Sequence, residues 1–368
     1  MVLGLETSCD ETAAAVVRGG REICSNVIAS QAELHRRYGG VVPEVASRRH
    51  LEAILPVVDA ALRQAGLEKR PPDLVAVTQG PGLVGSLLVG VALAKALAFA
   101  WKVPLVGVNH VEAHLYANFL AHPDLSPPLV CLIVSGGHSE LVYLSTSGQL
   151  EVLGRTRDDA AGEALDKLAR HLGLGYPGGA ALEELARKGD PAAVPLPRAL
   201  AGEETLEMSF SGLKTAALHY LEARGGDPAR LPPGVLADLA ASYQEAVVDV
   251  LVERLMRAAQ RKRVRQVALA GGVAANETLR RRVQAEAGAR GLEAFFPPPE
   301  LCTDNAAMVA CAGYHRWRGG EEAAWSLNAD PSLPLGRVSG GSCGKIVDKP
   351  VNIVDFFSTE ERGGGPSK

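Results

Sequence analysis

The fold of this 368-residue chain is decided by residues 2–17, which read VLGLETSCDETAAAVV. Two short apolar runs, residues 2–5 and 13–17, flank a polar turn at residues 6–12, and this pattern is typical of two paired strands. Residues 22–29 are compatible with a third strand. The chain is therefore expected to open as a β-meander.

Helices and buried strands are expected to alternate after this opening. Apolar residues from Leu51 to Leu62 recur at helical spacing and predict an amphipathic helix that ends near Gly66. Apolar strands are expected at residues 73–78 and 104–108, with an Ala- and Leu-rich helix between them. Strands that alternate with helices indicate an α/β lobe.

The opening pattern returns at residues 129–144, LVCLIVSGGHSELVYL, where two strands again flank a turn. Helices are expected at about 160–172, 180–188, 211–224 and 234–260, followed by a strand at 266–269. We therefore expect an N-terminal lobe at residues 1–125 and a C-terminal lobe at residues 126–335, with a ligand cleft between them. Residues 336–368 are Gly- and Ser-rich without periodicity and are expected to form a flexible tail.

Charge and cysteine usage narrow the functional class. Lys plus Arg number 38 and Asp plus Glu 42, so the formal net charge of -4 provides no global basic field for nucleic acid. Any RNA contact must come from local patches or from partner proteins. Six scattered cysteines form no disulfide framework, which favours a reducing cytoplasm. Neither a basic leader nor a run of about 20 apolar residues occurs, so we expect neither secretion nor a membrane span.

A candidate metal site begins with the sequence HVEAH at residues 110–114. His110 and His114 stand at i and i+4 on one helix face and can bind one metal ion, although they can also face solvent or cap a turn. A zinc protease requires H-E-x-x-H or H-x-x-E-H, whereas Glu112 projects away from the histidine face. Asp304, at an expected helix N-terminus, offers a third ligand, although a plain N-cap is the commoner role there.

Two double-glycine turns are candidate nucleotide contacts. Residues 135–138 lie between two strands, and residues 270–276 join a buried strand to a helix, where backbone amides can approach a phosphate. Each turn can equally serve packing alone. Residues 158–167 concentrate carboxylates, which can bind ribose hydroxyls or complement a helix dipole. Basic clusters at 48–49, 261–265 and 280–282 can contact RNA or be solvated faces.

Taken in order, these motifs resemble the tRNA N6-adenosine threonylcarbamoyltransferase family, formerly described as O-sialoglycoprotein endopeptidases. The resemblance covers residues 1 to about 335. It is carried by LETSCDET (5–12), PEVASR (43–48), QGPG (79–82), HVEAH (110–114), VSGGH (134–138), YPGG (176–179), SFSGLK (209–214) and GGV (271–273).

The resemblance implies an α/β, two-lobed fold of the actin, sugar kinase and Hsp70 (ASKHA) type, with a duplicated β-meander plus helices around a central nucleotide cleft. It implies transfer of the threonylcarbamoyl group from threonylcarbamoyl-adenylate to N6 of adenosine 37 in tRNAs that read ANN codons, with release of AMP. Similar bacterial enzymes act with a smaller inactive paralogue and a P-loop ATPase, and the layout of this chain fits the bacterial type. Two alternatives stay open: a non-catalytic nucleotide-binding scaffold and, less favoured, a metalloprotease.

Site residues follow from the resemblance position by position. It implies one divalent metal ion, usually Fe²⁺ with Zn²⁺ or another divalent ion as alternatives, bound by His110, His114 and Asp304. The metal is expected to act as a Lewis acid, and Asp10 or Glu11 to assist proton removal from the adenine amine or to orient the base. The adenylate is expected to contact Val134, Ser135, Gly136, Gly137, His138, Asp166, Gly179, Glu183 and Asn276.

Overall fold

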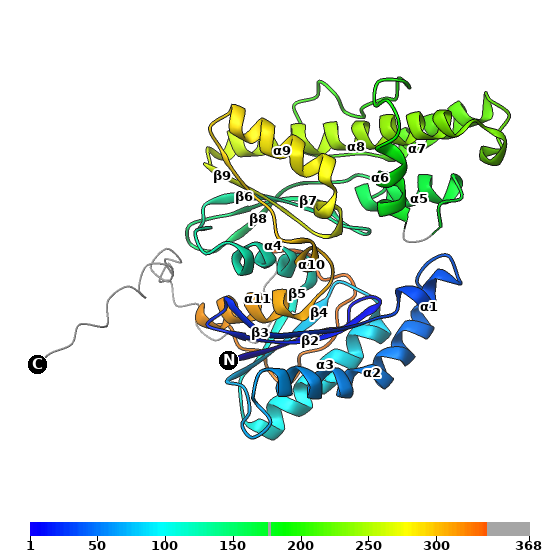
Figure 1. Cartoon of the computed structure of the whole chain (residues 1–368). Helices are drawn as coiled ribbons and strands as arrows, with labels where there is room; N and C mark the ends of the chain where they lie inside the picture. Colours follow the sequence, from blue (N-terminus) through cyan, green and yellow to red (C-terminus); the bar gives the residue numbers. More distant parts are fainter. Residues whose placement is uncertain (176–177, 337–368) are drawn as a thin grey trace, which may run out of the picture.

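The computed structural model describes residues 1–175 and 178–336 (Figure 1). The described residues form two five-stranded sheets, with strand orders β3-β2-β1-β4-β5 and β10-β9-β6-β7-β8. Helices lie on both sides of each sheet, so the predicted α/β class is confirmed. Residues 337–368 of the expected tail, and Tyr176 and Pro177 of the YPGG motif, lie outside the described residues.

The first sheet opens with the predicted meander. It contains β1 (Val2–Glu6), β2 (Glu11–Arg18), β3 (Glu22–Ser30), β4 (Leu74–Gly80) and β5 (Leu105–Asn109). β1, β2 and β3 pair antiparallel, whereas β1, β4 and β5 run parallel. The carboxyl ends of β1, β4 and β5 therefore meet at one edge of the sheet.

The second sheet repeats this topology strand for strand. It contains β6 (Leu129–Val134), β7 (Ser139–Leu144), β8 (Leu150–Arg155), β9 (Gln266–Ala270) and β10 (Glu293–Phe295). β6, β7 and β8 pair antiparallel, and β6, β9 and β10 pair parallel. The sequence predicted β6, β7 and β9 but missed β8 and β10. The shared topology supports the duplication that the sequence suggested.

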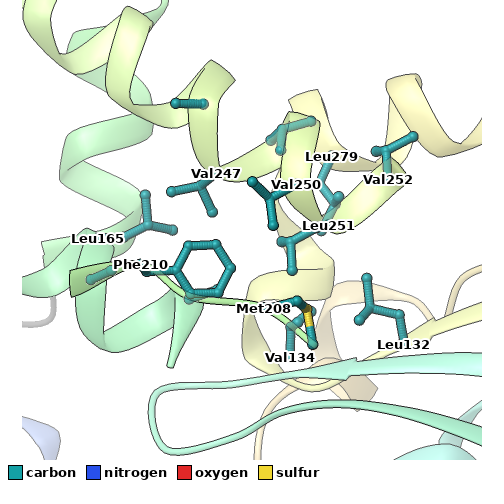
Figure 2. Packing of buried hydrophobic residues seen from close by; sticks show 14 of the residues in the cluster. Leu132, Val134, Leu165, Met208, Phe210, Val247, Val250, Leu251, Val252 and Leu279 are labelled. Carbon is teal, nitrogen blue, oxygen red and sulfur yellow. The ribbon is translucent and has the colours of Figure 1, made fainter. Parts of the chain in front are cut away.

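Helices cover the outer faces of both sheets. The first sheet is covered by α2 (Pro43–Gln64) and α3 (Val84–Trp101), and the short helix α1 (Ala32–Arg36) follows β3. The second lobe contains α5 (Ala161–His171), α6 (Gly178–Ala186), α7 (Ser211–Glu222), the 3₁₀ turn η1 (Pro228–Arg230), α8 (Pro233–Lys262), the 3₁₀ turn η2 (Gly272–Ala275) and α9 (Glu277–Ala289). In this lobe Met208 and Phe210 pack against Leu165, Val247 and Leu251, and so close the core beneath α8 (Figure 2).

Two helices, α4 (His110–Ala121) and α11 (Ala306–Arg318), form a layer between the sheets. α11 follows the short helix α10 (Pro299–Cys302) and lies directly on the first sheet. A Cβ at Gly4 would come within 2.3 Å of the Ala306 carbonyl oxygen, and one at Gly313 within 2.3 Å of the Ala76 Cβ. Only glycine permits this close approach of α11 to β1 and β4.

The chain thus returns to the first lobe near its end. Beyond α11, the Asp330 amide donates to the Gln79 carbonyl and the Gly82 amide to that of Pro331. Residues 306–335, which the sequence assigned to the C-terminal lobe, therefore pack on the first sheet. We propose a first lobe of residues 1–125 with 306–335 and a second lobe of residues 126–305.

By length and composition alone, α3 is the one helix in the described part of the chain that could cross a membrane. It packs against β4 and α2, and Lys95 within it donates to the Leu327 carbonyl. Core helices of soluble proteins pass the same test, so this helix is weak evidence for a membrane span.

Candidate metal and nucleotide site

The two histidines of HVEAH lie where β5 passes into α4. Asn109 caps α4 by accepting hydrogen bonds from the amides of Val111 and Glu112. His110 is therefore the first residue of the helix and His114 follows one turn later, with their ring centroids 4.8 Å apart. The cap fixes both imidazoles at the carboxyl edge of the first sheet.

Asp304 reaches the same place from the connection between α10 and α11. The N-cap of α11 is Asn305, whose Oδ1 accepts from the Met308 amide. The Asp304 carboxylate is therefore free of a capping role. Its Oδ1 lies 3.2 Å from His114 Nε2 and 3.5 Å from His110 Nε2.

These three residues fit a divalent metal ion. One ligand atom from each lies within 4.8 Å of the others. His114 is 1% exposed, and its Nδ1 makes no hydrogen bond, which is costly unless another group binds it. Its Nε2 lies beside Asp304 Oδ1 without a well-aligned hydrogen bond. Two imidazoles and one carboxylate suit iron, zinc and similar ions.

Electrostatics link the cluster to a second carboxylate, Glu6, at the end of β1. Burial alone would lower the pKa of His110, but Asp304 and Glu6 outweigh it and raise this pKa to about 9. Burial likewise opposes ionisation of Asp304 and Glu6, yet His110 keeps the pKa of both carboxyls below the ordinary value. Two carboxylates thus give this buried pocket the negative field that a divalent cation needs.

Glu6 also orients His110. Its Oε2 lies 3.1 Å from His110 Nδ1 and accepts from Thr78 Oγ1 at 2.7 Å, while Oε1 accepts from the Ser8 amide. With Nδ1–H directed at Glu6, Nε2 of His110 faces Asp304. The sequence did not predict this role for Glu6, although a carboxylate at the end of an otherwise apolar, buried strand is a signal of it.

Glu112 is directed away from the histidines, as predicted. Its carboxylate forms two hydrogen bonds with Arg316 of α11, from Nε at 3.1 Å and from Nη2 at 2.5 Å. A zinc-protease base would have to face the metal ion. The arrangement therefore argues against a protease of this class.

Of the two carboxyls that the sequence proposes as catalytic, Glu11 has the more unusual environment. Its Oε1 accepts from Ser30 Oγ, whereas Oε2 is buried without a hydrogen bond. Burial raises the pKa of Glu11 to about 7, and the charges of Asp10 and Asp304 add to this effect. A carboxyl that titrates near neutrality suits a general base. Asp10 lies beside it in the turn between β1 and β2.

The two double-glycine turns meet at the carboxyl ends of the parallel strands β6 and β9. Gly271 has a φ of +85°, and a Cβ there would come within 2.4 Å of the Val134 carbonyl oxygen. Gly136 and Gly137 of the other turn are exposed, and a Cβ at either would meet open space, so a ligand can approach this turn closely. Burial lowers the pKa of His138 to about 4, and the neighbouring His110 and His114 add to this.

The remaining expected adenylate contacts are engaged within the protein. Asp166 Oδ1 accepts the amides of Gly178 and Gly179, each at 2.9 Å. Glu183 accepts the Glu277 amide, and Asn276 caps α9 while donating to Gln244. These side chains shape the wall of the second lobe, and a ligand would have to share or displace their hydrogen bonds.

Most side chains of the basic clusters bind carbonyl or carboxylate groups of the same chain. Arg280 donates to the carbonyls of Ala274 and Pro297, and Arg282 pairs with Glu245 and Asp249. Arg261 pairs with Glu204, Lys262 with Glu151 and Arg49 with Glu52. Most of these charges therefore have partners within the protein, which favours the structural alternative for these clusters.

Comparisons with known proteins agree with this geometry. A family model described as tRNA N6-adenosine threonylcarbamoyltransferase matches residues 22–311. The chain is 60% identical over 338 residues to the protein of that name from Symbiobacterium thermophilum, covering 91% of this chain and 97% of that protein. It is 56% identical over 337 residues to the one from Moorella thermoacetica, with the same coverage of each.

Among solved structures, HypF from T. kodakarensis is similar with a TM-score of 0.57 at 19% identity. The match covers 86% of this chain and 48% of HypF. A second HypF structure, in the phosphate- and nucleotide-bound form, matches with a TM-score of 0.56 at 14% identity over 86% of this chain and 46% of that one. At such identity the likeness shows the fold alone, the two-lobed ASKHA type.

Proposed function

The chain belongs to the tRNA N6-adenosine threonylcarbamoyltransferase family, and we propose that it performs the transfer at a metal ion bound by His110, His114 and Asp304. As a transferase of this family, it moves the threonylcarbamoyl group from threonylcarbamoyl-adenylate to N6 of adenosine 37 in tRNAs that read ANN codons, and AMP is released. The observation that carries the catalytic assignment is the buried His-His-Asp cluster at the carboxyl edge of the first sheet.

The family implies a divalent metal ion, and we propose Fe²⁺, with Zn²⁺ as the principal alternative, because the donor set accepts both. When bound, the ion supplies Lewis-acid stabilisation of charge that develops on the carbamoyl or phosphate oxygens. The amides of the exposed Gly136 and Gly137 are proposed to bind the phosphate. The adenylate is proposed to lie along the wall formed by Val134, Ser135, His138, Asp166, Gly179, Glu183 and Asn276.

The adenine amine is a poor nucleophile, so its placement against the activated carbonyl supplies much of the rate. Glu11, with its buried Oε2 and a pKa near 7, is proposed to accept the amine proton as the new bond forms. Asp10 is proposed to orient the base beside it. A non-catalytic scaffold would have no need of a complete His-His-Asp set, and the pair with Arg316 removes Glu112 as a base for peptide hydrolysis.

The decisive experiment measures incorporation of labelled threonine into an unmodified transcript that reads ANN codons. The reaction contains the full chain, an adenylate-forming synthase and the proposed bacterial partners, before and after metal removal. Incorporation at adenosine 37 that chelation abolishes and metal restores supports the proposal. Binding of AMP without incorporation under any metal or partner set would favour the scaffold instead.

Replacing Glu6 with glutamine is expected to weaken metal binding about 10- to 100-fold, a typical effect of losing a carboxylate behind a metal-binding histidine. The amide keeps the size of the side chain but removes the charge that stabilises His110. Competition with a chromogenic chelator measures the affinity without any turnover. Glu140→Gln, in β7, is the matched control, and equal affinities of Glu6→Gln and wild type would refute the role of Glu6.

The partners are proposed to be a smaller inactive paralogue and a P-loop ATPase, as in similar bacterial enzymes. The protein is proposed to act in the cytoplasm.

An exposed apolar surface supports a protein partner. Leu51 and Leu55 of α2 are 65% and 61% exposed, and Val84 and Leu88 of the adjoining α3 are 54% and 45% exposed. Large apolar side chains spaced in this way mark interaction surfaces. We propose that the paralogue binds this α2–α3 surface.

Introducing charge on this surface tests whether the paralogue binds there. The double variant Leu51→Arg/Leu55→Arg is expected to weaken binding of the paralogue at least tenfold, because it places two charges in an apolar interface. Ile23→Arg, on an exposed part of β3, should bind as wild type does. Calorimetry or analytical ultracentrifugation gives the affinity, and unchanged binding by the double variant would place the paralogue elsewhere.

A further inference from the structure

The strongest unassigned feature is the rim where the two lobes meet beside the site. In the first lobe it consists of α1 and the loop that follows, residues 32–42. In the second lobe it consists of the last turn of α5, which ends at His171. Figure 1 shows α1 and α5 facing each other across the gap between the lobes.

Backbone contacts connect the elements of the rim to the site. The Gln31 amide donates to the Asp10 carbonyl at 3.0 Å, so α1 starts beside the turn that contains Asp10 and Glu11. On the other side the Gly162 amide donates to the Ser135 carbonyl at 3.2 Å, so the first turn of α5 lies at the double-glycine turn and its last turn forms the rim. α1 and α5 thus each start at a turn proposed to hold the reacting groups.

A hydrogen bond closes the rim across the lobes. Arg170 of α5 donates from Nη2 to the Gly39 carbonyl at 3.0 Å. Hydrogen bonds from one side chain hold the conformation of the loop: buried His35 accepts the Val42 amide on Nδ1 and hydrogen-bonds Gln31 Oε1 through Nε2. The geometry of the rim thus depends on both lobes and on one buried histidine.

Positive charge and an aromatic ring gather on this rim. Arg36, Arg37 and Arg170 are exposed, and Tyr38 is 60% exposed. The acidic residues on the facing elements are Glu33, which pairs with Arg36, Glu163, which pairs with Lys167, and Asp166, which accepts two backbone amides. Arg37 pairs with no carboxylate among the described residues. The rim is therefore locally basic on a chain with a net charge of -4.

We propose that this rim, formed by Arg36, Arg37, Tyr38 and Arg170, holds the anticodon loop of the substrate tRNA while adenosine 37 enters between the lobes. Arginine side chains contact loop phosphates, and an exposed tyrosine supplies a face on which an unstacked base can stack. The inference rests on the proposed function and adds the surface that receives the tRNA. Closure across the lobes by Arg170 would couple tRNA docking to assembly of the site.

The test measures binding of an unmodified anticodon stem-loop, and of the whole transcript, to the full chain in complex with the partners that support transfer. Arg37→Glu and Tyr38→Ala are each expected to weaken binding about tenfold. Arg37→Glu should also lower the slope of log Kd against log salt concentration by about one, which is the contribution of one phosphate contact. Arg265→Glu is the matched control, because this exposed arginine precedes β9 at the opposite end from the double-glycine turn.

Binding of AMP separates this inference from the proposed function. Arg37→Glu and Tyr38→Ala should bind AMP as wild type does and show a raised KM for tRNA. If both variants bind the stem-loop as tightly as wild type, or if Arg265→Glu weakens binding equally, the rim is not the tRNA surface. Absence of transfer by the wild-type complex would instead refute the proposed function, whatever the rim variants do.

Discussion

Replacing His114 or Asp304 with alanine is expected to lower threonine incorporation about a thousand-fold, because metal stabilisation of developing charge is worth several kcal/mol. Each residue supplies one of three ligand atoms that lie within 4.8 Å of one another. The two variants approach the site from different elements, α4 and the connection before α11. A parallel loss in both therefore indicates a shared metal ion and not local damage to one helix.

Metal content and fold must be measured beside the rate. Elemental analysis is expected to show substoichiometric metal in both variants, while thermal melting and AMP binding stay close to wild type. His219→Ala is the control, since His219 is exposed on α7 in the other lobe. Full metal occupancy with full activity in Asp304→Ala would show that the metal site lies elsewhere.

The sequence could predict what depends on local pattern. The meander, the alternation of strands and helices, and the pairing of His110 with His114 on one face all follow from side-chain periodicity. Strand β8 was missed because its sequence, LEVLGR, does not alternate regularly and is mostly half-exposed, and β10 because three residues carry little periodic signal. Asp304 could be proposed from the resemblance, but only the structure shows that Asn305 takes the capping role.

Long-range packing could not be predicted. Nothing in the order of residues indicates that α11 returns to the first sheet, because that placement depends on close approach at Gly4 and Gly313. The same applies to Glu6, whose role depends on a histidine 104 residues away. The two backbone amides that Asp166 accepts in its own lobe could not be predicted either, because they depend on where the residues after α5 pack.

The ion pair between Glu112 and Arg316 shows how this long-range packing can be tested. Arg316→Met is expected to reduce the free energy of unfolding by about 3–5 kcal/mol, the usual cost of leaving one member of a buried pair without its partner. The two side chains are 5% and 10% exposed, and Arg316 also donates to Glu321 and to the Gly107 carbonyl. Urea denaturation of the metal-free protein measures the change.

A double-variant cycle separates the ion pair from simple loss of packing. Glu112→Leu/Arg316→Met removes both charges and is expected to recover at least half of the stability lost by Arg316→Met, because no unpaired carboxylate remains at position 112. A double variant no more stable than the single one would assign the loss to packing or to Glu321. Since Glu112 lies between the two histidines of α4 and Arg316 lies near the end of α11, the pair fixes these two helices against each other. The single variant should therefore also bind metal more weakly, although neither residue touches the metal site.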